Sequence, residues 1–308
     1  MFVVCGEALM DVYVQEATPT GLRLDARIGG SPFNVAVGLA RLGRPAALLT
    51  GLSRDAAGER LLQALAAEGV DAGLVVRSDA PTTLSVVSVD AAGTPRYTFY
   101  GHGTADRAIT TDNLPALPAE ARVLQFGSYA LVVEPVGSAL RALAARERGR
   151  CLVAYDPNVR LNVEPDLARW RETVEAMAGL AHIVKVSDED LGLLYPDVPP
   201  AEMARRWLGA GAGLVVLTRG AHGSEAWTRK LHETGAAVTV KVVDAVGAGD
   251  TFQAALLTWL DEHDALSSDG LDGLDAAGLA ALLSFASRAA AITCSRRGAD
   301  MPRRAELD

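Results

Sequence analysis

Residues 242–252 form the segment of the sequence that is best suited to chemistry. They read Val-Val-Asp-Ala-Val-Gly-Ala-Gly-Asp-Thr-Phe. The apolar run 238–243 predicts a strand before the glycines, and apolar residues at 252, 255, 256, 259 and 260 predict a helix after them, because that spacing fills one helix face. A glycine-rich turn at a helix N-terminus offers unhindered backbone N–H groups to an anion. The turn is therefore a candidate phosphate site.

Asp250 lies at the edge of this candidate anion site. A carboxylate beside a bound phosphate is unfavourable if the turn only binds phosphate, because like charges repel. The carboxylate has a purpose if it takes the proton from a hydroxyl group that attacks the phosphate. From spacing alone, a second interpretation stays open, in which Asp250 only caps the helix.

A second glycine-rich segment, Gly29-Gly30-Ser-Pro-Phe-Asn34, leads into an apolar helix. Paired glycines let the backbone approach a ligand closely. Asn34 in the first helical turn could bind hydroxyl groups. A tight turn followed by an N-terminal cap explains the same residues equally well.

Short apolar runs alternate along the chain with segments of helical periodicity, which predicts βαβ units and a mostly parallel sheet covered on both faces. The runs are Phe2–Cys5, Ala46–Leu49, Val123–Phe126, Cys151–Tyr155, His182–Val186, Leu214–Leu217 and Val238–Val243. Ligands of such sheets bind beyond the carboxyl ends of the strands. The residues that follow the runs are therefore informative, and they include Gly6-Glu7, Gly127-Ser128, Asp156-Pro157-Asn158, Ser187-Asp188-Glu189-Asp190 and Thr218-Arg219-Gly220.

Two segments, Asp11–Ile28 and Thr83–Tyr100, alternate apolar and polar residues with period two, which is typical of half-buried antiparallel strands. Each has a turn signal in its middle, Pro19-Thr-Gly21 and Ala92-Gly-Thr-Pro95. We interpret them as a small β-flap that acts as a lid. Ordinary edge hairpins without a moving part remain the alternative.

Composition excludes several classes of protein. The chain of 308 residues has 29 basic and 38 acidic residues, a net charge of −9, which argues against binding to nucleic acid or anionic lipid. No apolar run approaches 18 residues, so no membrane span is expected. Three widely spaced cysteines suggest a reduced, cytoplasmic protein. There is no Gly-x4-Gly-Lys phosphate loop, and the histidines lack zinc-ligand spacing.

Both glycine-rich segments, in this order and at this distance, resemble the two signatures of the PfkB, or ribokinase-like, carbohydrate kinases. Gly51-Leu-Ser-Arg-Asp-Ala-Ala-Gly58 and Arg297-Gly-Ala299 match as well, so the resemblance covers essentially the whole chain. It implies an α/β fold, a ribokinase-like three-layer α/β/α sandwich with a mostly parallel central sheet and a small β-sheet lid. It also implies one kinase domain over 1–308, with the lid formed from about 12–28 and 83–104.

Within the family, three stretches are similar to fructokinases, namely 97–107, Tyr155-Asp-Pro-Asn-Val-Arg160 and Lys185-Val-Ser-Asp-Glu-Asp190. The resemblance implies an ATP-dependent sugar kinase that phosphorylates the 6-hydroxyl of D-fructose. The Asp-x-Asn-x-Arg stretch also occurs in 2-keto-3-deoxygluconate kinases, which are the nearest alternative. A non-catalytic sugar- or nucleotide-binding protein on the same fold is the alternative of a different class.

The resemblance also implies residue roles. Asp250 would be the general base, and the backbone of Gly247, Ala248 and Gly249 would stabilise the transferring phosphoryl group. The sugar would be bound by Asp11, Gly29, Gly30, Asn34 and Arg160, with Phe99 and Asp106 closing from the lid. The nucleotide would be bound by Lys185, Thr218, Gly220, Gly223, Gly249 and Ser287.

The implied cofactors are ATP, Mg²⁺ and K⁺. The family's Asn-x-x-Glu motif, which helps to hold magnesium through water, reads Ser187-Asp-Glu-Asp190 here. The shorter carboxylate of Asp190 leaves Glu189 as a substitute, and the sequence does not decide between them. Asp244 and the carbonyl of Val246 lie where relatives hold a monovalent cation. Because the exposed apolar face of the lid needs cover, we also expect two subunits to pair lid to lid.

Overall fold

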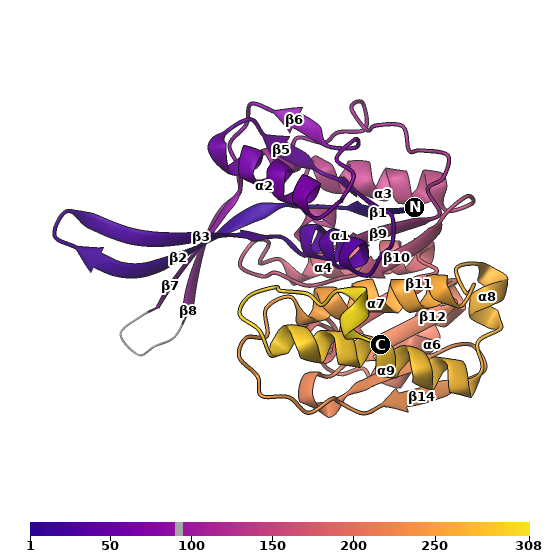
Figure 1. The fold of residues 1–308 in the computed structure, drawn as a ribbon. Coiled ribbons are helices and arrows are strands. Elements are labelled where there is room, and N and C mark those ends of the chain that lie inside the picture. Colours follow the sequence, from indigo (N-terminus) through magenta and orange to yellow (C-terminus); the bar gives the residue numbers. More distant parts are fainter. Residues whose placement is uncertain (90–94) are drawn as a thin grey trace.

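The computed structural model describes residues 1–89 and 95–308 and is built around one large sheet (Figure 1). Its strands follow the order β14-β13-β12-β11-β10-β9-β1-β4. Their bounds are Phe2–Cys5 (β1), Ala46–Leu49 (β4), Val123–Gly127 (β9), Leu152–Asp156 (β10), Ile183–Ser187 (β11), Leu214–Thr218 (β12), Ser224–Trp227 (β13) and His232–Gly235 (β14). The strands from β4 to β12 pair in parallel, while β13 and β14 pair antiparallel at one edge. The predicted mostly parallel sheet is confirmed.

Helices cover both faces of the sheet. Successive side chains of each central strand point to opposite faces, so the apolar residues of one strand belong to two different cores. Val4 of β1 belongs to one cluster of buried residues, and Val3 and Cys5 belong to another. On the first face lie α1 (Ser31–Arg41), α2 (Ala56–Ala67), α7 (Ala248–Glu262), α8 (Ser268–Asp272) and α9 (Ala276–Cys294). On the second lie α3 (Val136–Glu147), α4 (Leu167–Leu180), α5 (Asp188–Leu194) and α6 (Pro200–Ala210). These layers form the three-layer α/β/α sandwich.

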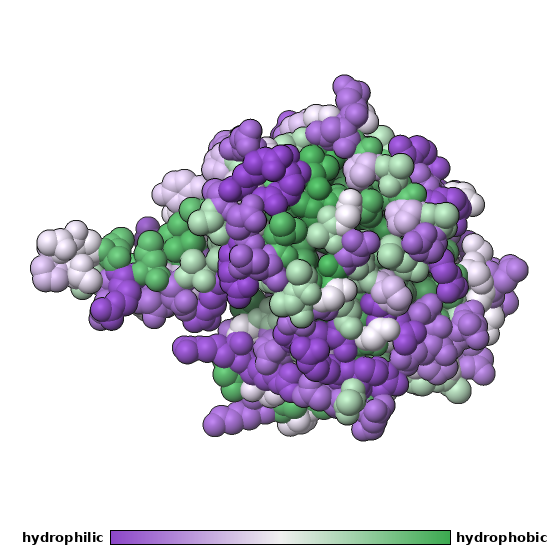
Figure 2. All heavy atoms as spheres, turned by 45° about the horizontal axis from the view of Figure 1, so that its top comes forward, coloured by the Kyte–Doolittle hydropathy of each residue, from purple (hydrophilic) through white to green (hydrophobic). Residues whose placement is uncertain are grey.

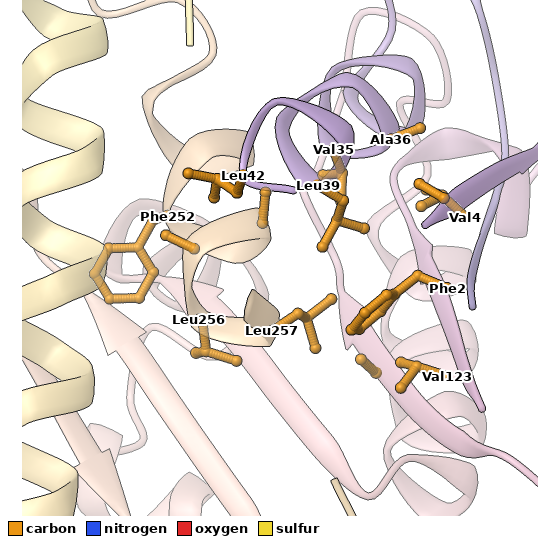
Figure 3. Packing of buried hydrophobic residues seen from close by; sticks show 14 of the residues in the cluster. Phe2, Val4, Val35, Ala36, Leu39, Leu42, Val123, Phe252, Leu256 and Leu257 are labelled. Atoms are coloured by element: carbon orange, nitrogen blue, oxygen red, sulfur yellow. The ribbon is translucent and has the colours of Figure 1, made fainter. Parts of the chain in front are cut away.

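Helices α1 and α7 pack directly on each other over the centre of the sheet (Figure 3). Leu39 of α1 and Leu256 of α7 are both fully buried. Gly38 permits the close approach, because a Cβ there would lie 2.8 Å from the Cβ of Ala254. Both helices begin at glycines, Gly30 and Gly247, so this packing brings their N-termini together.

The lid is a separate four-stranded sheet that projects from the body (Figure 1). Its order is β3 (Gly21–Gly29), β2 (Leu9–Thr18), β7 (Leu84–Val89) and β8 (Pro95–Tyr100). The turn expected at Pro19–Gly21 joins β2 to β3, as predicted. The second turn signal, Ala92–Pro95, lies outside the described residues except for Pro95. A small parallel pair, β5 (Gly51–Ser53) and β6 (Val76–Ser78), lies beside α2.

The strand predicted over Val238–Val243 is wrong. The segment between β14 and α7 forms no strand, and Val242 and Val243 are 64% and 58% exposed. The run has no neighbouring strand along it, and its backbone is tied back by the amides of Val243 and Asp244, which donate to the carbonyl of Cys294. Asp244 therefore leads into the glycine turn from an exposed loop.

Helix α9 is the one helix of the described residues that is long and apolar enough to cross a membrane by length and composition. It packs instead against α7 and the edge strands β13 and β14. Leu279, Leu282 and Leu283 on its inner face are fully buried. Its apolar character is thus used in the core of the first face.

Candidate active site

Asp250 lies in the first turn of α7 and is only 9% exposed. The Ser31 hydroxyl donates a hydrogen bond to its Oδ1 (2.6 Å), and Asn34 Nδ2 donates to its Oδ2 (2.8 Å). Both donors come from the first turn of α1, so the meeting of the two helix N-termini fixes the carboxylate in one orientation. The N-cap of α7 is Gly247, without a side-chain hydrogen bond, so the interpretation of Asp250 as a helix cap is wrong.

The environment of Asp250 tunes its basicity. Burial raises the pKa of its carboxyl above the ordinary value, while the hydrogen bonds from Ser31 and Asn34 and the charge of Lys185 act in the opposite direction. A carboxylate with a raised pKa binds a proton more strongly than an exposed aspartate, and it has two donors that hold it in place. Both properties suit a general base.

The glycine turn before α7 has a geometry that other residues could not adopt. Gly247 has φ 77°, and a Cβ there would lie 2.5 Å from the Cβ of Ala299. The amide of Ala248 donates to the carbonyl of Ala245 (3.2 Å) within the turn. The turn thus presents the N-terminus of α7, with its partial positive charge, beside Asp250.

Lys185 provides a full positive charge behind the turn. Its Nζ lies 2.8 Å from Asp156 Oδ2, and the two side chains are 4% and 5% exposed. The same Nζ lies 3.2 Å from the position that a Cβ would take on Gly249. The absence of a side chain at Gly249 therefore lets the buried ammonium group approach the candidate anion-binding turn.

A cavity of about 570 Å³ opens in front of Asp250. Of the residues predicted to bind the sugar, Asp11, Gly30, Asn34, Phe99 and Arg160 line it. Gly29 does not line the cavity, but it leaves space for Asp11, since a Cβ on Gly29 would lie 2.3 Å from Asp11 Oδ2. Burial raises the pKa of the Asp11 carboxyl. The structure thus brings together most of the predicted sugar site. Its residues come from α1, α7, the lid and the end of β10.

Asp106 is placed differently from the expectation. It is 3% exposed, is absent from the cavity lining, and accepts hydrogen bonds from Thr83, Thr104 (2.7 Å) and the Tyr129 hydroxyl (2.9 Å). The Tyr129 ring in turn packs edge-on against Phe99, with 5.3 Å between ring centroids. Asp106 therefore ties the base of the lid to the body rather than facing the cavity.

Of the residues predicted to bind the nucleotide, Gly249 lines this cavity, whereas Lys185, Thr218, Gly220, Gly223 and Ser287 do not. Thr218 ends β12 and pairs in register with Ser187 at the end of β11. Gly220 and Gly223 follow with φ 50° and 89°. Ser287 lies one turn after Leu283 on α9, which packs against the β13–β14 edge. Their role toward a nucleotide stays a prediction.

The candidate metal residues fall into two places. Glu189, which is exposed, and Asp190, which is 8% exposed, both line the cavity at the start of α5. Burial and the charge of Asp156 raise the pKa of Asp190 to about 6. Asp244 accepts from the amides of Val246 (3.1 Å) and Gly298 (2.9 Å). Within residues 1–89 and 95–308, no group of three His, Cys, Asp or Glu side chains forms a complete metal site.

Comparison with known proteins decides the family. The model of the pfkB family carbohydrate kinases matches residues 1–305. The chain belongs to the PfkB family. It is 38% identical over 275 residues to a fructokinase of Rhizobium leguminosarum bv. trifolii, which covers 89% of this chain and 84% of that protein.

Solved structures agree with this assignment. A fructokinase of Xylella fastidiosa with bound ATP superposes with a TM-score of 0.87 at 26% identity, covering 99% of this chain and 96% of the other. A fructokinase of Vibrio cholerae O395, with fructose, ADP and a calcium ion bound, gives 0.83 at 27% identity, with 99% and 97% covered. This PfkB protein is therefore a carbohydrate kinase with the ribokinase-like fold.

Sequence reasoning missed some residues of the kinase site. Ser31 reads as part of a turn, although its hydroxyl binds Asp250. Asp156 was noted as a strand end and within a fructokinase-like stretch but was given no role, although it pairs with Lys185. Glu7 likewise follows a strand and lines the cavity. The available signal was the position of Asp156 and Glu7 at carboxyl ends of strands; their partners depend on the strand order.

Proposed function

We propose that the chain is a fructokinase, which transfers the γ-phosphoryl group of ATP to the 6-hydroxyl of D-fructose. The observation that carries the proposal is the buried Asp250 carboxylate, oriented by Ser31 and Asn34 at the meeting point of the sugar cavity and the glycine turn. The fructokinase relatives support fructose as the substrate.

The residues around this carboxylate divide the reaction among them. Asp250 accepts the proton of the attacking hydroxyl. The glycine turn, with Lys185 behind it, stabilises the negative charge of the transferring phosphoryl group in the transition state. Asp11, Asn34 and Arg160 hold the sugar so that one hydroxyl faces Asp250. The lid excludes water, which would otherwise accept the phosphoryl group. The proposal treats residues 1–308 as one kinase domain, with the lid from about 12–28 and 83–104.

The cofactors of the proposal are ATP, Mg²⁺ and K⁺. Thr218, Gly220, Gly223 and Ser287 would hold the nucleotide next to the turn. Asp190 and Glu189 are oxygen donors at the cavity wall and fit the hard Mg²⁺ ion, which supplies charge neutralisation when bound. Asp244, on the loop before the turn, with the carbonyl of Val246, fits a monovalent cation. The bound ATP of the Xylella relative and the bound ADP and calcium of the Vibrio relative support nucleotide and metal use.

A substrate panel tests the proposed activity. With ATP and Mg²⁺, coupled ADP detection should give a kcat/KM for D-fructose at least about 10-fold above those for D-ribose, D-glucose and 2-keto-3-deoxygluconate, since a polar pocket rejects poorly matched hydroxyl patterns. The keto acid is the necessary competitor because Arg160, an exposed cation that lines the cavity, could bind its carboxylate. ADP release with the keto acid alone would assign the rival activity, and sugar binding without any ADP release would assign a binding protein.

The lid supports the proposed homodimer. Leu22 and Leu24 are 61% and 52% exposed and share one face of β3, because they are two residues apart. Figure 2 shows hydrophobic residues along the projecting lid. We expect sedimentation velocity at 10 μM protein to give a dimer for the wild-type chain and a monomer for Leu22→Asp/Leu24→Asp. This concentration exceeds the dissociation constant of a dimer that associates with a Kd of about 1 μM. A wild-type monomer would contradict pairing through the lid. The proposal places the enzyme in the cytoplasm, where free cysteines stay reduced, and includes no nucleic-acid or membrane partner.

A further inference from the structure

Glu7 is a buried acid of the sugar cavity that the proposed reaction does not use. It follows β1, is 1% exposed, and lines the cavity. Its Oε2 has no hydrogen-bond partner among the described residues. Burying a polar atom without a partner costs free energy, and native proteins keep such atoms rarely. An acid that lines a ligand cavity and has an oxygen without a protein partner is therefore a candidate contact to the ligand.

The position of Glu7 in the sheet supports a ligand contact. Strand β1 lies between β4 and β9. The chain reaches β4 through α1 on one face of the sheet, whereas β9 continues through α3 on the other face. The strand order therefore reverses between β1 and β9, and at such a point a crevice opens beyond the carboxyl ends of the strands. Glu7 and Ser128, the residues after these two strands, both line the cavity there.

Glu7 belongs to a different part of the cavity wall from Asp250. Glu7 lies beyond the end of β1, whereas Asp250 lies in the first turn of α7. A substrate that fills the cavity and places one hydroxyl at Asp250 can thus place another at Glu7.

We propose that Glu7, together with Ser128, forms a hydroxyl-binding subsite of the cavity, in which the Glu7 carboxyl contacts a sugar hydroxyl other than the one that is phosphorylated. This inference rests on the proposed function, because it requires that the cavity takes a sugar.

The protonation state of Glu7 suits a neutral hydroxyl. Burial raises the pKa of its carboxyl to about 8; the charge of Asp106 acts in the same direction, while the hydrogen bond with Ser128 and the charge of Arg160 oppose it. Burial raises the pKa of the Tyr129 phenol, and the charge of Glu7 also raises it. At neutral pH the acid is mostly protonated, so it can both donate to and accept from a hydroxyl. Glutamine, a neutral side chain of the same length that also donates and accepts, is therefore the matched control.

The test compares Glu7→Leu, Glu7→Gln and wild type with whichever sugar the wild-type enzyme turns over fastest. We expect Glu7→Leu to weaken sugar binding, measured by calorimetry, at least about 10-fold, the size of one lost hydrogen bond to a buried polar group, with the KM for ATP unchanged within about two-fold. Glu7→Gln should stay within about three-fold of wild type. Analogues of that sugar that each lack one hydroxyl identify the hydroxyl that Glu7 contacts. One analogue should bind the wild-type protein more weakly than the parent sugar does, whereas Glu7→Leu should bind that analogue and the parent sugar equally well.

Several results would overturn the subsite. One is that Glu7→Leu binds the sugar with an affinity within two-fold of wild type. Another is that both proteins discriminate equally against every deoxygenated analogue. If Glu7→Leu does not fold, the pH dependence decides: wild-type sugar affinity should fall as the pH rises from 7 to 9.5, and that of Glu7→Gln should not. Identical profiles would exclude the contact. Failure of the proposed function looks different, because the wild-type panel would then show no phosphorylated sugar.

Discussion

Asp250→Asn should lower kcat by about 10³-fold, because an amide cannot accept the proton of the attacking hydroxyl. The sugar KM should change by less than about five-fold, since asparagine keeps the shape of the side chain and an oxygen for the hydrogen bond from Asn34. Steady-state kinetics with coupled ADP detection measures both constants. Because burial raises the Asp250 pKa, the acid limb of the wild-type kcat profile should lie at higher pH than for an exposed aspartate, and activity should fall below that pKa as the base becomes protonated.

Asp261→Asn is the matched control for this substitution. Asp261 lies near the other end of α7 and pairs with Arg44 at 2.9 Å, away from the cavity. Its loss should leave kcat within about two-fold, the effect expected for an ion pair outside the site. If Asp250→Asn kept more than a tenth of the wild-type kcat, Asp250 would not be the base.

Lys185→Met should be the most destabilising of the substitutions considered. It removes one partner of a buried ion pair and leaves the Asp156 carboxylate, whose Oδ1 already lacks a hydrogen-bond partner in the described chain, uncompensated. Breaking such a pair costs about 3–5 kcal/mol of the free energy of unfolding. Urea unfolding followed by circular dichroism measures the loss. Activity should also fall by about 10²-fold or more, because the charge behind Gly249 is gone.

The double variant Lys185→Met/Asp156→Leu separates these two effects. Two apolar side chains can fill the buried site without an unpaired charge, so most of the lost stability should return. Activity should not return, since no cation then lies behind the turn. A double variant as active as wild type would show that Lys185 serves the fold alone. A loss below about 1 kcal/mol in the single variant would contradict the buried pair.

The fold was largely predictable because its central strands are short, continuous apolar runs. Phe2–Cys5 and Ala46–Leu49 are buried on both faces. A short, continuous apolar run of this kind is typical of a central strand in a parallel sheet. Val238–Val243 is also rich in valine, although it contains Thr239 and Lys241, and it is not a strand. Its sequence carries no information about whether a partner strand lies beside it. The wrong element did not affect the site, since the turn at Gly247 depends on the glycine and on α7.

The candidate site was predictable where one motif holds all the information. Asp250 and Gly247 belong to a single segment, so their spacing was visible. The contacts of Asp106 with Thr83 and Tyr129, by contrast, join segments whose proximity depends on how the lid attaches to the body. Asp106 was therefore expected to face the sugar, whereas it holds the base of the lid. No role was predicted for Ser31 or Glu7 for the same reason, because only the assembled fold shows what lies next to them.

The hydrogen bond from Asn34 to Asp250 joins residues 216 positions apart. A ribosome must therefore complete most of the polypeptide before Asp250 and its donors can meet, and a fragment that lacks the start of α1 or of α7 cannot form this arrangement. Recovery of enzymatic turnover after dilution from denaturant consequently requires these two helices to dock, whereas helical content can return earlier.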